Sequence, residues 1–355
     1  MTISLCMIVK DEEKVLKRCL LGVADLVDEI IIVDTGSTDN TKKIAHEFTE
    51  KVYDFPWIDD FSAARNYSFS LASGDYLLWL DADDYIPQTE KEKFVALKEQ
   101  LQANVPDGVF CRYLCPVDAN MPPFSYVRER FLKRSTTHVW KGVVHECVAV
   151  SGKRLYSNFS VWHYGNDKPR ENRNLTIYRK YIEKGNVLSA RDEFYYAREL
   201  YYNGYWIESI ARIDYFLSRK DGWVINKIDA CKIKAECLLQ LNEEKHALET
   251  LFSSFLYGEP RASVLCAIAH IFTRQRKWKD AEKWYLFALQ TGSHVKDGDF
   301  ETQADYTLNP LLGLTQACFQ LGEKERAKEY HKQALSLFPR HPSVLYNEEF
   351  FKNNP

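Results

Sequence analysis

One stretch, residues 73–87, constrains the fold of this 355-residue chain more than any other. A Gly74-Asp75 turn leads into an unbroken apolar run from Tyr76 to Leu80. Such a run predicts a strand that is buried on both faces, and Pro87 ends whatever follows it. In open α/β sheets, ligands bind beyond the carboxyl ends of the strands. The residues directly after Leu80 therefore occupy a position where a functional site is expected.

Three carboxylates occupy that position, at Asp81, Asp83 and Asp84. Carboxylates this close repel one another and stay ionised at low cost only when a cation lies among them. Oxygen ligands that arrive from one side suit Mg²⁺ or Mn²⁺, which keep other coordination positions for substrate phosphates. A solvated acidic turn has the same residues, so this stretch alone leaves both interpretations open.

Composition excludes several classes of protein. A length of 355 residues suits two domains, and 45% hydrophobic with 27% charged residues is ordinary for a globular chain. A net charge of −3 gives no reason to expect nucleic acid as a partner. The nine cysteines include no Cys-x-x-Cys pair, which predicts buried free thiols in a reducing cytoplasm. The first apolar run, Ile3–Val9, is too short for a signal peptide, and we expect no transmembrane segment.

The first third of the chain alternates strand and helix patterns. Buried strands are predicted at Ile3–Val9 and Glu29–Val33, each followed by a polar turn and a helix. A short third strand is predicted at Lys51–Asp54. Two successive βα units predict a parallel sheet with right-handed crossovers. The Ser/Thr/Asp-rich turn at 34–41 either contacts a ligand through Asp34 or only caps the next helix.

A helix that begins at Phe61 carries Arg65 near its start, where a cation gains nothing from the helix dipole. That placement indicates a phosphate or carboxylate partner, with a surface salt bridge as the alternative. Farther on, Val109–Leu114 predicts a strand, and the alternation of charge and bulk in Arg128–Arg134 predicts an edge strand with one exposed face.

Two later segments place titratable groups beside aromatic residues. Trp140 precedes Gly142 and offers a flat apolar face for a sugar ring, while His145 and Glu146 offer proton acceptors. A second segment ends in His163. From the residues alone, a core tryptophan and a surface His-Glu hydrogen bond remain open as alternatives.

Four motifs stand in order: Val33–Asp39, Ala64-Arg65-Asn66, Gly74-Asp75 and Leu80–Asp84. Together they make residues 1 to 165 resemble the family-2 nucleotide-sugar glycosyltransferases of the GT-A fold. The resemblance implies that Asp34 accepts a hydrogen bond from the nucleotide base. It also implies that Asp83 binds the metal and that Asp81 faces the ribose or the metal shell. Nucleotide-sugar binding is thereby expected at Lys10, Glu12, Asp34, Arg65, Asp81, Ala82 and Trp140. Thr35 stands where many relatives have a second acid, so only Asp34 is assigned there.

A subset of that family shares the Trp-x-Gly-x-x-His-Glu box at 140–146 and the His-Tyr-Gly turn at 163–165. This resemblance implies that Glu146 is the general base, that His145 orients the substrate or the base, and that His163 completes a metal site with Asp83 and Asp81. The implied reaction inverts the anomeric centre and needs one base and a divalent cation, Mg²⁺ or Mn²⁺. Arg65 and Arg130 are candidates to hold the leaving diphosphate, because guanidinium groups bind phosphate bidentately.

From about Arg170 the strand patterns end and helical spacing continues to the end of the chain. Small residues recur in pairs 12 apart, with intervals of 38, 34 and 46 residues between pairs, which indicates helical hairpins resembling tetratricopeptide repeats. The pairs are Ala197/Ser209, Ala235/Ala247, Ala269/Ala281 and Thr315/Ala327. An insertion is expected over 293–310. A dense aromatic group at 195–206 suits either the core or an exposed contact face, and a homodimer through these helices is possible.

We therefore expect two domains: a GT-A α/β domain with a Rossmann-like, mostly parallel sheet at residues 1–168, and an all-α tetratricopeptide-like helical-hairpin domain at 169–355. The expected enzyme transfers a sugar from UDP-glucose or UDP-GlcNAc to Ser, Thr or Cys of a peptide, as in enzymes that glycosylate bacteriocin precursors. Flagellin-modifying enzymes also fit. One alternative is transfer to a lipopolysaccharide core or another envelope glycan. The alternative of another class is an inactive transferase domain that serves as a peptide-binding scaffold.

Overall fold

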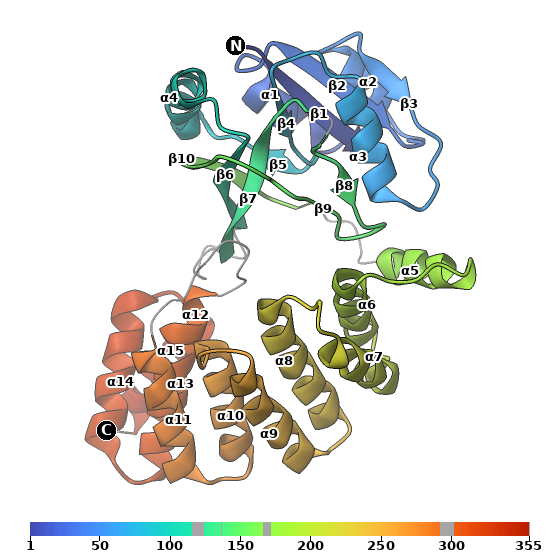
Figure 1. The fold of residues 1–355 in the computed structure, drawn as a ribbon. Helices are drawn as coiled ribbons and strands as arrows, with labels where there is room; N and C mark the ends of the chain where they lie inside the picture. The colour runs from blue at the N-terminus through green and yellow to red at the C-terminus, as the bar shows by residue number, and fades with distance from the viewer. Residues whose placement is uncertain (116–123, 136, 166–171, 292–301, 355) are drawn as a thin grey trace. The chain divides into compact units, whose positions relative to one another are not determined.

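The computed structural model describes residues 1–115, 124–135, 137–165, 172–291 and 302–354. The chain divides into two compact units, the first formed by residues 1–115 and 125–185 and the second mainly by residues 186–355. The expected domain boundary at 168/169 lies among residues 166–171, outside the described residues. The first unit carries the strands and the second is helical (Figure 1).

An eight-stranded sheet of order β3-β2-β1-β4-β7-β6-β10-β5 organises the first unit. Its strands are β1 (Ile3–Val9), β2 (Glu29–Asp34), β3 (Val52–Asp54), β4 (Tyr76–Trp79), β5 (Asp84–Tyr85), β6 (Gly108–Cys115), β7 (Phe124–Lys133) and β10 (Arg154–His163). A separate two-stranded sheet pairs β8 (Trp140–Lys141) with β9 (Cys147–Val148). The helices of this unit are α1 (Leu16–Val23), α2 (Thr41–His46), α3 (Phe61–Ser70), α4 (Gln88–Asn104) and α5 (Arg173–Glu183).

The parallel sheet predicted from the βα pattern is confirmed. Strand β1 pairs in parallel with both β2 and β4, and β2 pairs in parallel with β3. Strand β7 then runs antiparallel to β4, so the sheet is mixed beyond that point. The prediction of an edge strand at Arg128–Arg134 was wrong, because β7 lies inside the sheet between β4 and β6. Its charged residue Arg130 is tolerated there through a buried ion pair described below.

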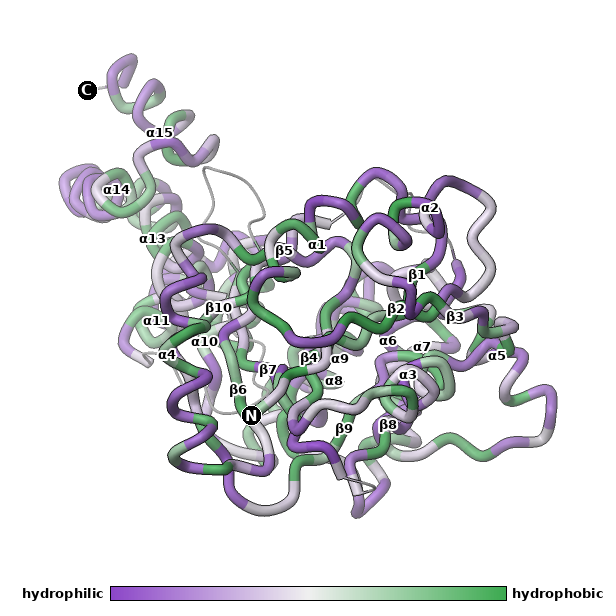
Figure 2. Tube along the Cα trace, turned by 90° about the horizontal axis from the view of Figure 1, so that it is seen from above, coloured by the Kyte–Doolittle hydropathy of each residue, from purple (hydrophilic) through white to green (hydrophobic). Residues whose placement is uncertain are grey.

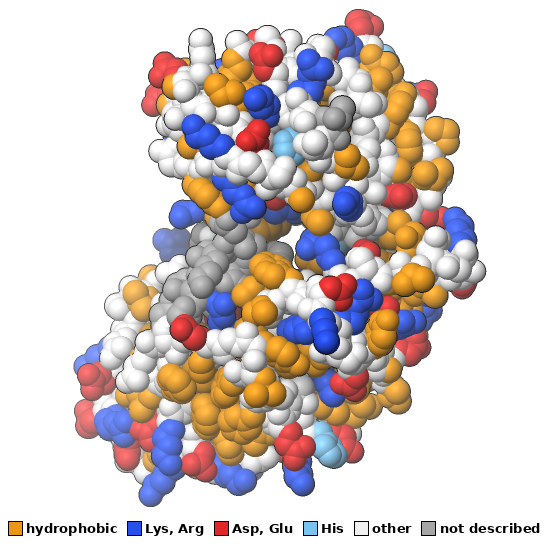
Figure 3. Space-filling model, in the orientation of Figure 1, with side chains coloured by type: hydrophobic (Ala, Val, Ile, Leu, Met, Phe, Trp, Pro, Cys, Tyr) orange, Lys and Arg blue, Asp and Glu red, His pale blue; other side chains and the backbone are white. Residues whose placement is uncertain are grey.

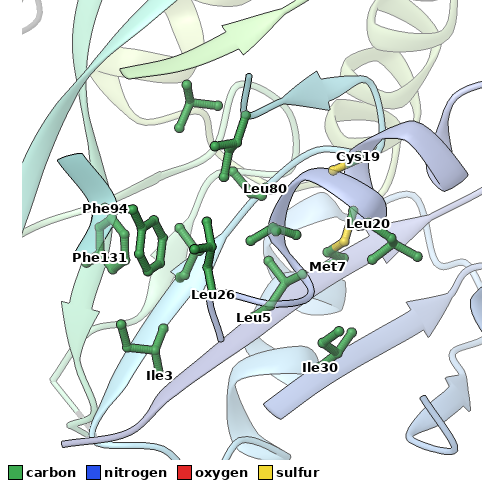
Figure 4. Close-up of a cluster of buried hydrophobic side chains, with 14 of the residues drawn as sticks. Ile3, Leu5, Met7, Cys19, Leu20, Leu26, Ile30, Leu80, Phe94 and Phe131 are labelled. Atoms are coloured by element: carbon green, nitrogen blue, oxygen red, sulfur yellow. The ribbon is translucent and has the colours of Figure 1, made fainter. Parts of the chain in front are cut away.

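Apolar side chains cover both faces of the sheet, as the alternation of a strand requires. On one face Ile3, Leu5 and Met7 of β1 pack with Leu20 of α1 and Phe94 of α4 (Figure 4). On the other face Cys6, Ile31 and Trp79 pack with residues of α3 and with Trp140. The trace of β1 and β2 is largely hydrophobic (Figure 2). The continuous apolar runs in the sequence therefore reflect strands with helices or other structure on both sides.

Glu29 ties the amino-terminal ends of three segments together. Its carboxylate accepts hydrogen bonds from the Ser4 hydroxyl, from the Ser73 backbone N–H at 2.8 Å and from Lys51 Nζ at 2.5 Å. Gly74 N–H donates to Ser4 Oγ at 2.8 Å, and a Cβ at Gly74 would stand 2.5 Å from that oxygen. The Gly74-Asp75 turn before β4 therefore needs a glycine for close approach to β1.

Glu29→Gln is expected to destabilise the fold by about 2 kcal/mol at pH 7, since a charged acceptor with several donors is lost. Burial opposes ionisation, but hydrogen bonds from Lys51, Ser4 and Ser73 outweigh it and lower the pKa of Glu29 from 4.5 to about 2. The stabilisation is complete above pH 4.5 and is lost as the pH falls towards 2. Urea unfolding from pH 7 to pH 3 tests this: the difference between wild type and variant shrinks with falling pH. A difference independent of pH contradicts it.

The second unit is a series of antiparallel helical hairpins. The pairs are α6 (Ala190–Tyr202) with α7 (Trp206–Ser218), α8 (Val224–Gln240) with α9 (Glu244–Ser253), α10 (Ala262–Arg274) with α11 (Trp278–Gln290), and α13 (Leu308–Gln320) with α14 (Lys324–Leu337). A 3-10 turn (Ser254–Leu256), α12 (Gln303–Tyr306) and α15 (Pro342–Asn353) complete the unit. The expected insertion at 293–310 is partly corrected, because α12 and the start of α13 fall within it; residues 293–301 lie outside the described residues.

The small-residue pairs lie where the two helices of each hairpin meet. All eight residues are buried, none more than 4% exposed. In the first hairpin Ser209 Oγ donates to the backbone carbonyl of Ala197 at 2.8 Å. Each hairpin also turns at a left-handed residue seven positions after its first small residue: Gly204, Asn242, Arg276 and Gly322. The repeat in the sequence therefore corresponds to a repeat in backbone conformation, and the helical-hairpin prediction is confirmed.

The aromatic group at 195–206 divides between core and surface. Tyr195 and Tyr196 are buried, whereas Tyr202 is 57% exposed. The nine cysteines are all free thiols, as expected from their spacing. Across the described ranges, no helix is both long and apolar enough to cross a membrane.

Candidate active site

The loops after β1 and β2 are bound to each other beside the predicted nucleotide pocket. Asp11 N–H donates to Ser37 Oγ at 2.9 Å, and Glu12 N–H donates to Thr41 Oγ1 at 2.7 Å. These contacts hold the segment of Lys10 and Glu12 against the turn that follows Asp34. The structure therefore brings together three of the predicted nucleotide-sugar contacts.

Asp34 itself is 1% exposed at the end of β2. Its Oδ1 accepts hydrogen bonds from the backbone N–H groups of Gly36 at 2.9 Å and Ser37 at 2.8 Å. Its Oδ2 is buried and has no hydrogen-bond partner among the described residues. A buried carboxylate oxygen without a donor is costly, which makes this atom a suitable acceptor for a ligand N–H.

Arg65 joins the acidic stretch to the Trp-x-Gly-x-x-His-Glu box. Its Nη2 donates to Asp81 Oδ1 at 2.8 Å and its Nε donates to Glu146 Oε1 at 2.6 Å. The guanidinium lies 4.9 Å from the ring centroid of Trp79 and 5.0 Å from that of Trp140. Such cation–π contacts and two charge-assisted hydrogen bonds fix the side chain in one position. The partner of Arg65 is therefore a pair of the protein's own carboxylates, not a surface salt bridge.

Asn66, which follows Arg65 in α3, also positions the Trp-x-Gly-x-x-His-Glu box. Its side-chain amide donates to the Trp140 carbonyl at 3.0 Å and accepts from the Trp140 N–H at 2.8 Å. The Val144 carbonyl accepts from Tyr178 Oη at 3.2 Å, so α5 holds the loop from its other side. His145 within this loop has a left-handed backbone, with φ of 52°. Glu146 is thus carried by a segment fixed at both ends.

Trp140 corrects one expectation. Its indole is 2% exposed and contacts Trp79 edge-on, with ring centroids 5.1 Å apart. A buried ring offers no open face to a sugar, so Trp140 acts here by packing against Arg65. The core alternative, which the sequence left open, is the one that the structure adopts.

The acids that follow β4 have three different environments. Asp81 pairs with Arg65; burial opposes its ionisation, but the charges of Arg65 and Arg130 prevail and lower its pKa to about 2. Burial raises the pKa of Asp83 to about 6 despite nearby His163, and the charges of Asp81 and Asp84 add to the shift. Asp83 therefore carries a negative charge that its protein neighbours do not balance.

Asp84 is a buried structural acid. It is 0% exposed, accepts from Tyr113 Oη at 2.6 Å and from the Asp81 N–H at 2.9 Å, and pairs with Arg130 at 3.0 Å. The Arg130 guanidinium lies between the rings of Trp79 and Tyr113, 3.9 and 4.3 Å from their centroids. Arg130 is therefore committed to the protein interior and is not an exposed phosphate ligand, which corrects its expected role.

Arg130→Met is expected to cost about 3–5 kcal/mol of stability, because it leaves Asp84 buried without its counter-ion. Urea unfolding measures this loss. Lys91→Met is the matched control, since Lys91 pairs with the exposed Asp25 at 2.8 Å and a surface pair contributes about 1 kcal/mol or less. Equal losses in the two variants contradict a structural role for the Arg130–Asp84 pair.

His163 reaches the acidic stretch through strand pairing. Strand β5 pairs antiparallel with β10, with Asp84 opposite His163, and Tyr164 N–H donates to the Asp83 carbonyl at 3.3 Å. His163 Nδ1 lies 3.5 Å from an oxygen of Asp83 and 3.5 Å from one of Asp84, too long for a strong hydrogen bond. The ligand atoms of these three residues all lie within 4.8 Å of one another.

This donor set fits a hard divalent cation. Asp83 is unbalanced in charge, and the buried Nδ1 of His163 has no hydrogen-bond partner among the described residues. Oxygen and imidazole ligands suit Mg²⁺ or Mn²⁺. Asp84 has its oxygens occupied by Tyr113, Arg130 and the Asp81 N–H, so Asp83 and His163 are the candidates to face the ion. Asp81, expected as a third ligand, lies outside the described cluster and pairs with Arg65.

Four residues important to this geometry were missed or given another role: Asn66, Asp84, Tyr113 and Arg130. The sequence held partial signals for two of them, because Asn66 directly follows Arg65 and Asp84 directly follows Asp83. Tyr113 and Arg130 meet Asp84 only because β6, β7 and β5 belong to one sheet.

A protein-family model described as glycosyl transferase family 2 matches residues 4–165. Every predicted site residue falls within that range. Residues 4–165 form a family-2 glycosyltransferase domain. The family-2 domain has the GT-A fold, and an all-α domain of tetratricopeptide-like hairpins follows it.

Curated relatives cover parts of the chain. Glycosyltransferase SunS of the SPbeta prophage in Bacillus subtilis is 29% identical over 214 residues, 56% of this chain and 49% of that protein. A TPR repeat-containing protein of Synechococcus elongatus is 46% identical over 113 residues, 28% of each chain. This chain therefore spans about half or less of the length of these relatives. The crystal structure of S. aureus TarS has a TM-score of 0.42 at 14% identity, with 71% of this chain and 55% of that chain covered.

Proposed function

We propose that this chain is an inverting, metal-dependent glycosyltransferase that moves a sugar from a UDP-sugar, UDP-glucose or UDP-GlcNAc, to a Ser, Thr or Cys side chain of a peptide. The observation that carries the proposal is the bridge made by Arg65. One guanidinium joins Asp81, from the donor-side acidic stretch, to Glu146, from the acceptor-side box. The residues that we assign to the donor and to the acceptor therefore share one hydrogen-bonding partner in the family-2 domain.

Each polar group has a role that its environment supports. Asp34 accepts an N–H of the base through its unpaired Oδ2, with Lys10, Glu12 and Ala82 beside the nucleotide. Asp83 and His163 hold Mg²⁺ or Mn²⁺, and Asp81 faces the ribose. The ion, when bound, neutralises negative charge that develops on the leaving diphosphate. Glu146 takes the proton of the acceptor while its neighbour His145 orients the substrate.

Arg65 serves two residues at once in this proposal. Its Nε hydrogen bond to Glu146 Oε1 fixes the position of the proposed base. Its second hydrogen bond fixes Asp81 on the donor side. Attack by the acceptor from the face opposite the diphosphate inverts the anomeric centre, and no protein nucleophile is required.

A peptide acceptor is favoured by the helical-hairpin unit, because such arrays present extended surfaces to peptides. The resemblance to enzymes that glycosylate bacteriocin precursors points the same way. The free thiols suit a reducing cytoplasm.

Mass spectrometry of candidate peptides, encoded beside this gene, after incubation with a panel of UDP- and GDP-sugars tests the proposal. The expected result is a mass increase of one sugar on a Ser, Thr or Cys residue. Transfer only to a lipopolysaccharide core or another envelope glycan contradicts the peptide acceptor. Peptide binding without turnover of any nucleotide sugar contradicts the enzyme and favours a scaffold.

A further inference from the structure

The helical-hairpin unit contains a cavity of its own, with a volume of about 880 Å³. We call it the inner groove. It is lined by residues of α6, α8, α10, α13 and α15, together with Tyr285 from α11 and Asp305 from α12. Figure 3 shows apolar side chains gathered over this unit. None of its lining residues belongs to the family-2 domain, so this groove is distinct from the site described above.

The residues that line the inner groove come from equivalent repeat positions. The position directly after the first small residue of a hairpin supplies Glu236, His270 and Gln316. The position three residues before that small residue supplies Lys232, Cys266 and Leu312. These equivalent positions carry different side chains and form a row across successive helices. In a repeat array, such a row can contact successive residues of an extended ligand.

One end of the row carries an acid without a counter-ion. Glu236 on α8 lies in the groove lining and has no ion pair or hydrogen bond within the described part of the chain. Lys232, one turn earlier, lies 3.6 Å from Asp229 and is therefore already paired. The groove at α8 thus offers an unbalanced negative charge, which complements a Lys or Arg side chain of a ligand.

The other end of the row is aromatic and contains amide groups. Phe319 of α13 and Phe350 of α15 contact each other with ring centroids 5.0 Å apart, and Tyr346 beside them is 70% exposed. Gln316 and Gln320 are exposed along α13 and make no hydrogen bond to any described residue. Side-chain amides both donate and accept, so they match the backbone of an extended peptide.

We propose that the inner groove binds an extended peptide segment that carries a Lys or Arg opposite Glu236 and a large apolar residue against Phe319, Phe350 and Tyr346. This rests on the proposed function, because the segment is the part of the acceptor peptide that the enzyme recognises. At the usual spacing of about 8–10 Å between neighbouring helices, the two steps from α8 through α10 to α13 span about 16–20 Å. An extended chain advances about 3.4 Å per residue, so the two ligand residues stand about five or six positions apart.

Labelled 12-residue peptides of Ser and Gly that contain one Lys and one Phe at varied separation serve as the probe. Fluorescence polarisation with the full chain measures their affinity. The expected result is tightest binding when the separation is about five or six residues. Glu236→Lys is expected to weaken binding about tenfold or more, and a peptide with Glu in place of Lys is expected to recover it.

Two control variants show whether a loss of peptide affinity is specific to groove residues or follows from any change at an exposed residue. Glu249→Lys changes an exposed acid on α9 outside the groove, and Leu345→Ala changes an exposed residue next to Tyr346. Tyr346→Ala should weaken binding, whereas both controls should not. Affinity that is independent of separation and equal in all four variants overturns the proposal. Sedimentation gives a second test. If the wild-type chain is a dimer and Tyr346→Ala is a monomer, a second copy of the chain occupies the groove and the proposal is overturned.

Turnover distinguishes this inference from the function on which it rests. UDP release from a UDP-sugar by the wild-type chain, without separation-dependent peptide binding, overturns the inference and leaves the transferase intact. Separation-dependent binding without turnover of any nucleotide sugar overturns the transferase and leaves the groove as a peptide site.

Discussion

Glu146→Gln is expected to lower the rate of sugar transfer by about 10²–10⁴-fold while the affinity for UDP stays within about twofold. In the wild type, Arg65 Nε donates to Glu146 Oε1 at 2.6 Å. The glutamine amide has nearly the shape of the carboxylate and its oxygen still accepts a hydrogen bond, so Arg65 keeps this partner in the variant. The amide cannot take up a proton at neutral pH. Transfer therefore loses its base while the donor pocket keeps its geometry.

The measurement compares transfer to an acceptor, or to water in its absence, with UDP binding by calorimetry. Thermal unfolding of the same variant shows whether the fold is kept. Glu50→Gln, an exposed acid remote from the predicted site residues in sequence, serves as the control and should match wild type. Full activity in Glu146→Gln would show that another residue is the general base. A parallel loss of UDP affinity indicates that Glu146 only supports the donor pocket.

Asp83→Ala is expected to remove the metal dependence of UDP binding. Changes that only reorient metal ligands cost about 10–100-fold in metal affinity, so the loss of a ligand costs at least about 100-fold. In wild type, Mn²⁺ should tighten UDP binding, because the ion balances Asp83 and the diphosphate together. In the variant, UDP should bind with the same low affinity in Mn²⁺ and in EDTA.

Asp25→Ala is the matched control for that experiment, since Asp25 is an exposed acid on the same unit with a surface partner, Lys91. It should respond to Mn²⁺ as wild type does. Unchanged UDP affinity of Asp83→Ala in the presence of Mn²⁺ contradicts the assignment of Asp83 to the metal. His163→Ala should behave as Asp83→Ala does, because the proposal assigns both residues to the same ion.

The sequence predicted the parts of the fold that depend on local pattern. Apolar runs such as Ile3–Val9 and Tyr76–Leu80 became central parallel strands, because only residues buried on both faces lack alternation. The small-residue pairs predicted the hairpins because a close helix contact excludes large side chains. Arg128–Arg134 was misread, since alternating charge is typical of an edge, and only the tertiary partner of Arg130 reveals a strand inside the sheet.

The candidate site was predicted in part for the same reason. Asp34, Asp83 and His163 were expected from the family resemblance together with their positions at strand ends, and the structure places Asp83 and His163 in one cluster. The pairing of Arg65 with both Asp81 and Glu146 was not predictable, because its partners are 16 and 81 residues away in sequence. The burial of Trp140 likewise depends on Trp79, a residue of another strand. Such long-range pairs depend on the topology of the fold, and no local spacing in the sequence indicates them.

The release of UDP from a panel of UDP-sugars, measured in Mn²⁺ and in EDTA with the wild-type chain, tests most directly whether this acid cluster supports sugar transfer. We predict release with at least one UDP-sugar in Mn²⁺, its loss in EDTA and its recovery when Mn²⁺ or Mg²⁺ is returned. No release with any UDP- or GDP-sugar under either condition would contradict the account.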